Sequence, residues 1–192
     1  MKSTIKIISL FLLVIVTSCL APKAVSTIVS DNYNEKKNQT TYMKFPYGSI
    51  SLPGQWTKTF FNQNSGQQNF KNKDTLSTAL LINRASGYPF YTKAMTSNQF
   101  VKAMYEWDAN YMTAQINGNS KIIMQDTANH FIVWQIIADN DKYQIDNLNL
   151  FGCENGIVFT VLAPTAKKLT NEQKINFVRT IYENKTVGTC CN

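Results

Sequence analysis

The spacing of apolar residues from residue 42 onward predicts a series of strands interrupted by helices. Strands are indicated where apolar positions alternate with polar ones, or form short runs bounded by turn residues. The run HFIVWQIIA at 130–138 is apolar on both faces and is therefore expected to be a central, buried strand. The other expected strands comprise two short ones within 45–52 and further strands at 57–61, 67–71, 77–83, 121–125, 143–151 and 157–163.

A helical pattern replaces the strand pattern at residues 96–115. Thr96 and Gln99 have the spacing of a capping box, in which each side chain bonds the other residue's backbone N–H. Asn117 and Gly118 are expected to end the helix. Its apolar stripe is expected to face the core and not a ligand groove, and it consists of Phe100, Met104, Trp107 and Tyr111.

A second helix is predicted at residues 170–184. Thr170 and Gln173 repeat the capping-box spacing. The order of elements is then strands, helix, strands, helix. This order predicts an α+β domain in which two main helices cover an antiparallel sheet.

The expected strand at 143–151 changes the parity of its apolar positions. Tyr143 and Ile145 have one parity, whereas Leu148 and Leu150 have the other. A β-bulge near residues 146–147 would produce such a change, because one extra residue moves the following side chains to the opposite face. The Asn-Gly pair at 155–156 predicts a type I′ hairpin turn after this strand.

The N-terminal segment differs from the rest of the chain. Lys2 and Lys6 precede a ten-residue apolar run, Ile7–Val16, which is too short to span a bilayer. It fits the apolar region of a secretory signal peptide. The four residues VTSC that end at Cys19 resemble the lipobox of bacterial lipoproteins. That resemblance implies removal of residues 1–18, acylation of Cys19 and attachment of the chain to a lipid bilayer through the acylated cysteine.

The resemblance also sets the expected organisation and location. Residues 19–41 are polar and are expected to form a flexible tether between the lipidated cysteine and the domain. The domain is expected at 42–185, with a cysteine-containing tail at 186–192. Because Leu20 and not an aspartate follows the cysteine, the resemblance implies the outer membrane of a Gram-negative envelope.

Charge and composition narrow the choice of partners. The formal net charge is +7, and residues 19–105 carry ten Lys or Arg against three acids. Such a basic half can meet an anionic lipid surface or an acidic partner, although scattered surface lysines also account for it. The basic residues are isolated from one another, and an exported protein rarely meets nucleic acid. A nucleic-acid partner is therefore not expected.

Three cysteines remain once Cys19 is assigned to lipidation: Cys153, Cys190 and Cys191. An exported chain is in a compartment that permits disulfides. A bridge from Cys153 to Cys190 or Cys191 would pin the C-terminal tail, and one cysteine would be left over. The alternatives are a strained bridge within the adjacent pair, free thiols, and a metal or redox role for the pair.

The domain resembles the PsbP-like fold of the extrinsic subunits of photosystem II, which bacterial lipoproteins also use. The resemblance rests on ISLPGQW (50–56), the two long strands HFIVWQIIA and GIVFTVLAP, and the closing helix that begins at LTNEQ. It covers about residues 43–184 and implies an α/β/α sandwich. It further implies a binding protein, such as an adaptor or assembly factor, and not an enzyme.

No arrangement of residues predicts catalysis, and no cofactor or metal is expected. His130 is the single histidine, and Glu106 and Asp108 are two positions apart on a helix, so their side chains do not face each other. The best candidate for binding is the aromatic segment around residues 88–91, because large side chains on irregular segments are common at interfaces. The expected partner-binding residues are Tyr88, Phe90, Tyr91 and Lys93.

These patterns lead to two functional hypotheses. The first is a membrane-anchored, non-catalytic lipoprotein that binds another envelope protein as an adaptor, assembly factor or inhibitor, for instance an immunity protein. The second is a carrier of a small molecule or lipid that uses a pocket between helix and sheet. A thiol-dependent enzyme would need a reactive thiolate at Cys153 or in the C-terminal pair.

Overall fold

The computed structural model describes residues 26–164 and 169–188. Within these residues the chain forms eleven strands and two α-helices, with a 3₁₀ turn, η2, at Ala85–Gly87. The helices are α2 (Ser97–Ile116) and α3 (Asn171–Glu183). The strands are β1 (Ile28–Asn34), β2 (Gln39–Phe45), β3 (Gly48–Pro53), β4 (Trp56–Asn62), β5 (Gln67–Asn72), β6 (Ser77–Arg84), β7 (Asn119–Asp126), β8 (Phe131–Asp139), β9 (Gln144–Glu154), β10 (Ile157–Leu162) and β11 (Thr186–Val187).

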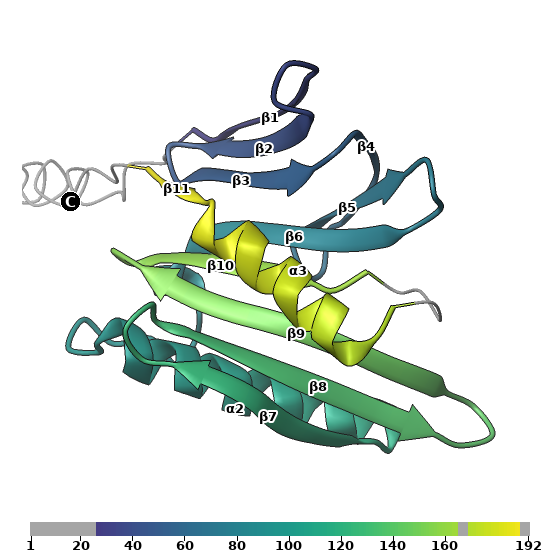
Figure 1. Cartoon of the computed structure of the whole chain (residues 1–192). Helices are drawn as coiled ribbons and strands as arrows, with labels where there is room; N and C mark the ends of the chain where they lie inside the picture. Colours follow the sequence, from purple (N-terminus) through teal and green to yellow (C-terminus); the bar gives the residue numbers. More distant parts are fainter. Residues whose placement is uncertain (1–25, 165–168, 189–192) are drawn as a thin grey trace, which may run out of the picture.

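A seven-stranded antiparallel sheet forms the centre of the domain. Its strand order is β4-β5-β6-β10-β9-β8-β7. Helix α2 lies on one face of this sheet and α3 on the other (Figure 1). The α+β class with two helices covering an antiparallel sheet is thus confirmed.

The central strand β8 shows how the sequence produces two covered faces. Successive side chains of a strand point to opposite faces. Phe131 and Val133 belong to the apolar cluster that contains α3, whereas Ile132 and Trp134 belong to the cluster that contains α2. All four are at most 1% exposed. The run that is apolar on both faces is therefore buried on both faces, as predicted.

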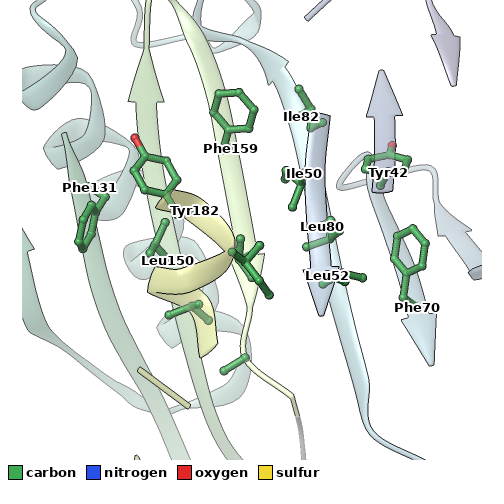
Figure 2. Packing of buried hydrophobic residues seen from close by; sticks show 14 of the residues in the cluster. Tyr42, Ile50, Leu52, Phe70, Leu80, Ile82, Phe131, Leu150, Phe159 and Tyr182 are labelled. Atoms are coloured by element: carbon green, nitrogen blue, oxygen red, sulfur yellow. The ribbon is translucent and has the colours of Figure 1, made fainter. Parts of the chain in front are cut away.

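A second sheet, with strand order β1-β2-β3-β11, packs on the same face as α3. Figure 2 shows Ile50 and Leu52 of β3 beside Leu80 and Ile82 of β6. All four side chains are at most 1% exposed. Burial of each such side chain contributes roughly 1.5–3 kcal/mol relative to an exposed position. Strand β3 and helix α3 therefore share the covering of this face.

Part of the segment expected to be a tether is folded, so that part of the prediction is wrong. Strand β1 pairs antiparallel with β2 over its whole length, from Ile28 opposite Phe45 to Asn34 opposite Gln39. No side chain of β1 is buried. Backbone hydrogen bonds to β2 and an ion pair between Asp31 and Lys58 of β4 hold it in place. A prediction based on buried apolar positions cannot detect such a strand.

The helix boundaries agree with the capping-box predictions. The side chain of Thr96 accepts from the backbone N–H of Gln99, and the Gln99 side chain accepts from the backbone N–H of Thr96. Thr170 and Gln173 form the same pair at α3. None of the helices in the described part of the chain is long and apolar enough to cross a membrane.

The β-bulge expected near residues 146–147 is absent from the described pairing of β8 with β9. The register runs without a shift from Phe131 opposite Gly152 to Asp139 opposite Gln144. Strand β9 is thus regular. Its apolar residues change from one face to the other for a different reason, which the groove described below explains. The hairpin after β9 is as predicted, because Asn155 and Gly156 have the positive φ values of 51° and 74° that a type I′ turn requires.

Helix α3 is fixed to the sheet through Tyr182. Its ring lies against Gly152 of β9, where an added Cβ would be 2.1 Å from the nearest ring atom. The Tyr182 hydroxyl donates to the backbone oxygen of Asn129 at 3.0 Å. The Lys185 ammonium lies 3.7 Å from the centroid of the Tyr182 ring and 2.9 Å from Glu154 Oε2. Glycine at position 152 thus permits the close approach of α3.

We predict that Gly152→Ala lowers the free energy of unfolding by about 1–3 kcal/mol, because the new methyl group overlaps the Tyr182 ring. Urea unfolding of the full chain measures this difference. Gly87→Ala is the matched control, since nothing lies within 4 Å of a Cβ added there. Equal stability of the two variants would contradict this account of how α3 docks.

Candidate functional site

A groove of about 620 Å³ runs beside α2, over strands β6, β10 and β9 of the seven-stranded sheet. Helix α2 packs over β7, β8 and β9, and it leaves the adjoining part of the same face open. The aromatic segment after η2 and the turn between β4 and β5 complete the rim. Small-molecule sites have typical volumes of about 300–1,000 Å³, so the groove has the size of such a site.

The floor of the groove follows from the strand register. Residues that lie opposite each other on neighbouring strands share a face of the sheet. Thr160 of β10 lies opposite both Phe151 of β9 and Leu81 of β6. Asn149 lies opposite Trp134 of β8. The floor therefore alternates between apolar and polar side chains.

The asparagines of β9 explain the change of parity in that strand. Asn147 and Asn149 line the groove, while Leu148 and Leu150 between and after them are buried in the α3-side cluster. At the start of the strand, Ile145 packs under α2 on the same face as the asparagines. Strand β9 is thus regular along its length. Its apolar side chains point to the covered parts of the sheet, and its asparagines point to the part that is open to the groove.

Two buried donor groups in the groove lining have no partner among the described residues. They are the indole Nε1 of Trp134 and the hydroxyl of Thr160. The two residues are only 1% and 3% exposed. An unpaired buried polar atom costs about 1–3 kcal/mol, and in native proteins each such atom calls for an explanation. A ligand with hydrogen-bonding groups would offer one once the side chains that cover these two atoms move aside.

One wall of the groove is a stripe on α2. Positions three and four apart lie on the same side of a helix, which brings Met104, Trp107, Asp108, Tyr111 and Met112 to the groove. The expectation that the predicted stripe faces the core is correct for Phe100 and Met104 and wrong for Trp107 and Tyr111. These last two are 46% and 60% exposed. Both side chains line the groove beside the strands that α2 covers.

Asp108 is the single residue with a formal charge in the groove lining. Burial raises the pKa of its carboxyl group from 3.8 to about 6. Within the described ranges, 26–164 and 169–188, Asp108 makes no salt bridge or side-chain hydrogen bond. Its neighbour Glu106, by contrast, is exposed and lies 3.5 Å from Lys102. The two acids of α2 thus occupy different environments.

The aromatic segment predicted to bind a partner lies at the end of the groove, folded against the start of α2. The rings of Phe90 and Phe100 have centroids 5.4 Å apart, and those of Phe90 and Trp107 are 5.8 Å apart. Tyr88 reaches the groove lining, whereas Phe90 and Tyr91 are half-buried against the α2-side cluster. Lys93 is exposed. That these four residues contact a partner stays a prediction.

The cysteines are only partly placed. Cys153 is buried and forms no disulfide within the part of the chain that the structure describes. Burial raises the pKa of its thiol to about 11, so the thiol is neutral at physiological pH and a poor nucleophile. The lipidation residue Cys19 and the other two disulfide candidates, Cys190 and Cys191, lie outside the described residues.

No group of three or more potential metal ligands occurs among the described residues. His130 contacts Asn98, with 3.1 Å between His130 Nδ1 and Asn98 Oδ1. Its backbone oxygen accepts from the N–H of Cys153. His130 thus lies in the turn that precedes β8, with a positive φ of 56° and one ring nitrogen beside Asn98.

Comparison with known proteins shows the fold. No protein-family model matches the sequence, and no curated protein matches it. The structure is similar to the solution structure of the cyanobacterial PsbP protein, CyanoP, from Synechocystis sp. PCC 6803. The TM-score is 0.51 at 10% sequence identity, and the match covers 87% of this chain and 96% of CyanoP. The domain therefore has a PsbP-like fold, as the sequence resemblance implied.

We predict that Asp108→Asn stabilises the protein at neutral pH by an amount on the order of 1 kcal/mol. Folding raises the pKa of the Asp108 carboxyl, so the folded protein binds this proton more tightly than the unfolded chain does. The resulting stabilisation is complete below about pH 4 and is lost as the pH rises through about 6. The advantage of the variant should therefore be present at pH 7.5 and vanish near pH 4. Urea unfolding at both pH values measures it.

Glu106→Gln is the control for this prediction, because Glu106 is exposed on the same helix and its surface ion pair contributes little. It should show no comparable gain at pH 7.5. A gain from Asp108→Asn that is equally large at pH 4 would contradict the assignment of the effect to ionisation of a half-buried carboxyl.

Proposed function

We propose that this protein is a non-catalytic, membrane-anchored carrier or receptor that binds a small molecule in the groove between α2 and the seven-stranded sheet. The observation that carries the proposal is a groove of ligand size that is lined by two residues with buried donors, Trp134 Nε1 and Thr160 Oγ1, which have no partner among the described residues. A site with mostly apolar walls and a few placed polar groups has the composition of a ligand pocket.

The chemistry of the lining favours binding over catalysis. The groove offers amides, hydroxyls, aromatic rings and one carboxyl. An acid and a base acting together would need a second titrating group beside Asp108. The other titratable side chains in the lining are two phenols, Tyr88 and Tyr111. Burial is the main cause that raises the pKa of the Tyr88 hydroxyl, which makes it a weak acid at neutral pH.

Anchoring is proposed from the sequence at Cys19. The VTSC motif follows a short apolar run, and the described structure begins at residue 26, only seven residues after the cysteine. Because β1 begins at Ile28, the connection to the membrane is much shorter than the tether expected from composition. In this proposal the domain is held in the envelope, on the outer membrane.

The ligand hypothesis predicts that the full chain, purified from its native host, retains a small molecule that denaturation releases. Asn149→Tyr should abolish this retention, because a larger side chain on the groove floor occupies the site. Asn119→Tyr, at an exposed position of β7, is the matched control and should leave retention unchanged. Mass spectrometry of the denatured extracts measures both variants. Retention by Asn149→Tyr at the native level would contradict the proposal.

The anchoring hypothesis predicts that Cys19→Ser transfers the protein from the membrane fraction to the soluble fraction. Acyl chains bind a bilayer with about 0.8 kcal/mol for each buried methylene group, and the variant cannot carry them. Fractionation of cells with immunodetection checks the distribution, and intact mass reports the lipid. A membrane-bound Cys19→Ser form would show that another part of the chain provides attachment.

Protein binding is the second candidate function, and a specific surface favours it. Ile28, Met43 and Phe45 lie on the outer face of the four-stranded sheet and are 63%, 41% and 57% exposed. Exposed apolar groups that adjoin one another mark interaction surfaces. This apolar patch is close in sequence to Cys19, so a partner there would be an envelope protein near the membrane. An adaptor, assembly factor or inhibitor would use such a surface.

Cross-linking in intact cells distinguishes the second candidate from the first. If the patch binds a protein, Phe45→Ser should lose one stoichiometric cross-linked partner. Phe61→Ser, at an exposed position of β4 in the other sheet, should keep it. Two results would contradict a role for the patch: capture of the same partner by the native protein and both variants, or capture of abundant envelope proteins alone. Either result would leave the groove as the binding site.

A further inference from the structure

The groove has an uncompensated negative charge. Among its lining residues there is one carboxyl group, Asp108, and no lysine or arginine. An ionised group that is partly removed from water is unfavourable unless an opposite charge or hydrogen bonds accompany it. Asp108 has neither among the described residues. An anionic ligand would add to this unfavourable energy. A neutral ligand could relieve it only through hydrogen bonds, whereas a cation would relieve it through its charge as well.

Aromatic rings line the groove together with this carboxyl. Trp107 precedes Asp108, and Tyr111 lies three residues after it on the groove side of α2. Tyr88 faces them from the aromatic segment, with its ring centroid 6.0 Å from that of Trp107 and the two planes at 87°. Ring faces attract cations, and several rings together form the cages that hold organic ammonium groups. The electrostatics of the carboxyl and of the rings thus favour the same type of ligand.

We propose that the ligand of the groove is a compact organic cation, whose ammonium group lies between Asp108 and the rings of Tyr88, Trp107 and Tyr111. This inference rests on the proposed ligand-binding function and specifies its chemistry. The rest of the ligand lies over the sheet, where Asn147 and Asn149 provide amide donors and acceptors. Trp134 and Thr160, whose side-chain donors have no partner within the described part of the chain, belong to this floor.

Binding of a cation at Asp108 should depend on pH. The charged and titratable groups that line the groove are Asp108 and the two phenols, while β5, β6, β8, β9 and β10 contribute none. On α2 itself, Glu106 and Lys102 pair on the exposed side. Because the pKa of the empty site's carboxyl is about 6, cation affinity should increase as the pH rises from 5 to 7.5 and then level off.

The test uses the full chain in an uncharged detergent and probes of defined charge. Choline, ethanolamine and spermidine are the cationic probes, N-acetylglucosamine is the neutral probe and succinate is the anionic one. Isothermal titration at pH 7.5 should detect at least one cationic probe. Its affinity should fall about tenfold or more in Asp108→Asn. In Glu106→Gln, which removes an acid from the exposed side of the same helix, it should change less than about twofold.

A further variant separates the roles of charge and ring. Trp107→Leu keeps an apolar side chain but removes the ring, and it should weaken the cationic probe while succinate still fails to bind. If the cationic probe binds Asp108→Asn as tightly as the native protein, or if N-acetylglucosamine binds and no cation does, the cation inference is overturned and the ligand-binding function stands. If no probe binds and no molecule is retained on purification, both are overturned.

Discussion

The unequal covering of the seven-stranded sheet is the constraint on which the rest of the structure depends. On one face, α3 and the four-stranded sheet together cover the strands, and the side chains there are almost completely buried. On the other face, α2 extends over β7, β8 and β9 but not over β10 and β6. The uncovered part becomes the groove. Fold stability and the candidate site thus have one origin, the position at which a single helix packs on a sheet.

The same constraint places polar groups where a ligand can use them. A fully covered face must be apolar, because an unpaired polar atom there is costly. On the strands that α2 does not cover, asparagines and a threonine take the place of aliphatic residues. Asp108 of α2 lines the same open space. Two donors, on Trp134 and Thr160, are nevertheless buried and find no partner in residues 26–164 and 169–188. The groove therefore has the composition of a site that a ligand completes.

The sequence predicted the strongly patterned elements correctly and the weakly patterned ones poorly. Both capping boxes and the buried strand at 131–139 follow from local signals that tertiary contacts do not override. Strand β1 could not be predicted, because exposed side chains carry no periodic pattern and its stability comes from pairing with β2. The PsbP-like fold was recognisable from the order of elements and a few short motifs such as ISLPGQW, although the sequence identity to CyanoP is only 10%.

The candidate site was only partly predictable. Trp107 and Tyr111 were expected in the core, because their spacing matches a buried stripe and spacing cannot show where the neighbouring sheet ends. Asn147 and Asn149 did leave a signal, the change of parity in β9, but it was interpreted as a bulge. Asp108 gave no signal in the sequence, because the pattern around an acidic residue on a helix is the same whether the side chain faces solvent or a groove. Tyr88, which was proposed for binding, does reach the groove.

The most direct test of the account is to observe the three indole N–H signals of the protein by NMR while the ligand released from it by denaturation is added back. Trp107 and Trp134 line the groove, whereas Trp56 lies outside it and already donates its indole N–H to the backbone oxygen of Pro53 at 2.7 Å. We expect the Trp134 and Trp107 signals to shift and the Trp56 signal to remain in place. An unchanged Trp134 signal in the presence of bound ligand would contradict the assignment of the groove as the binding site.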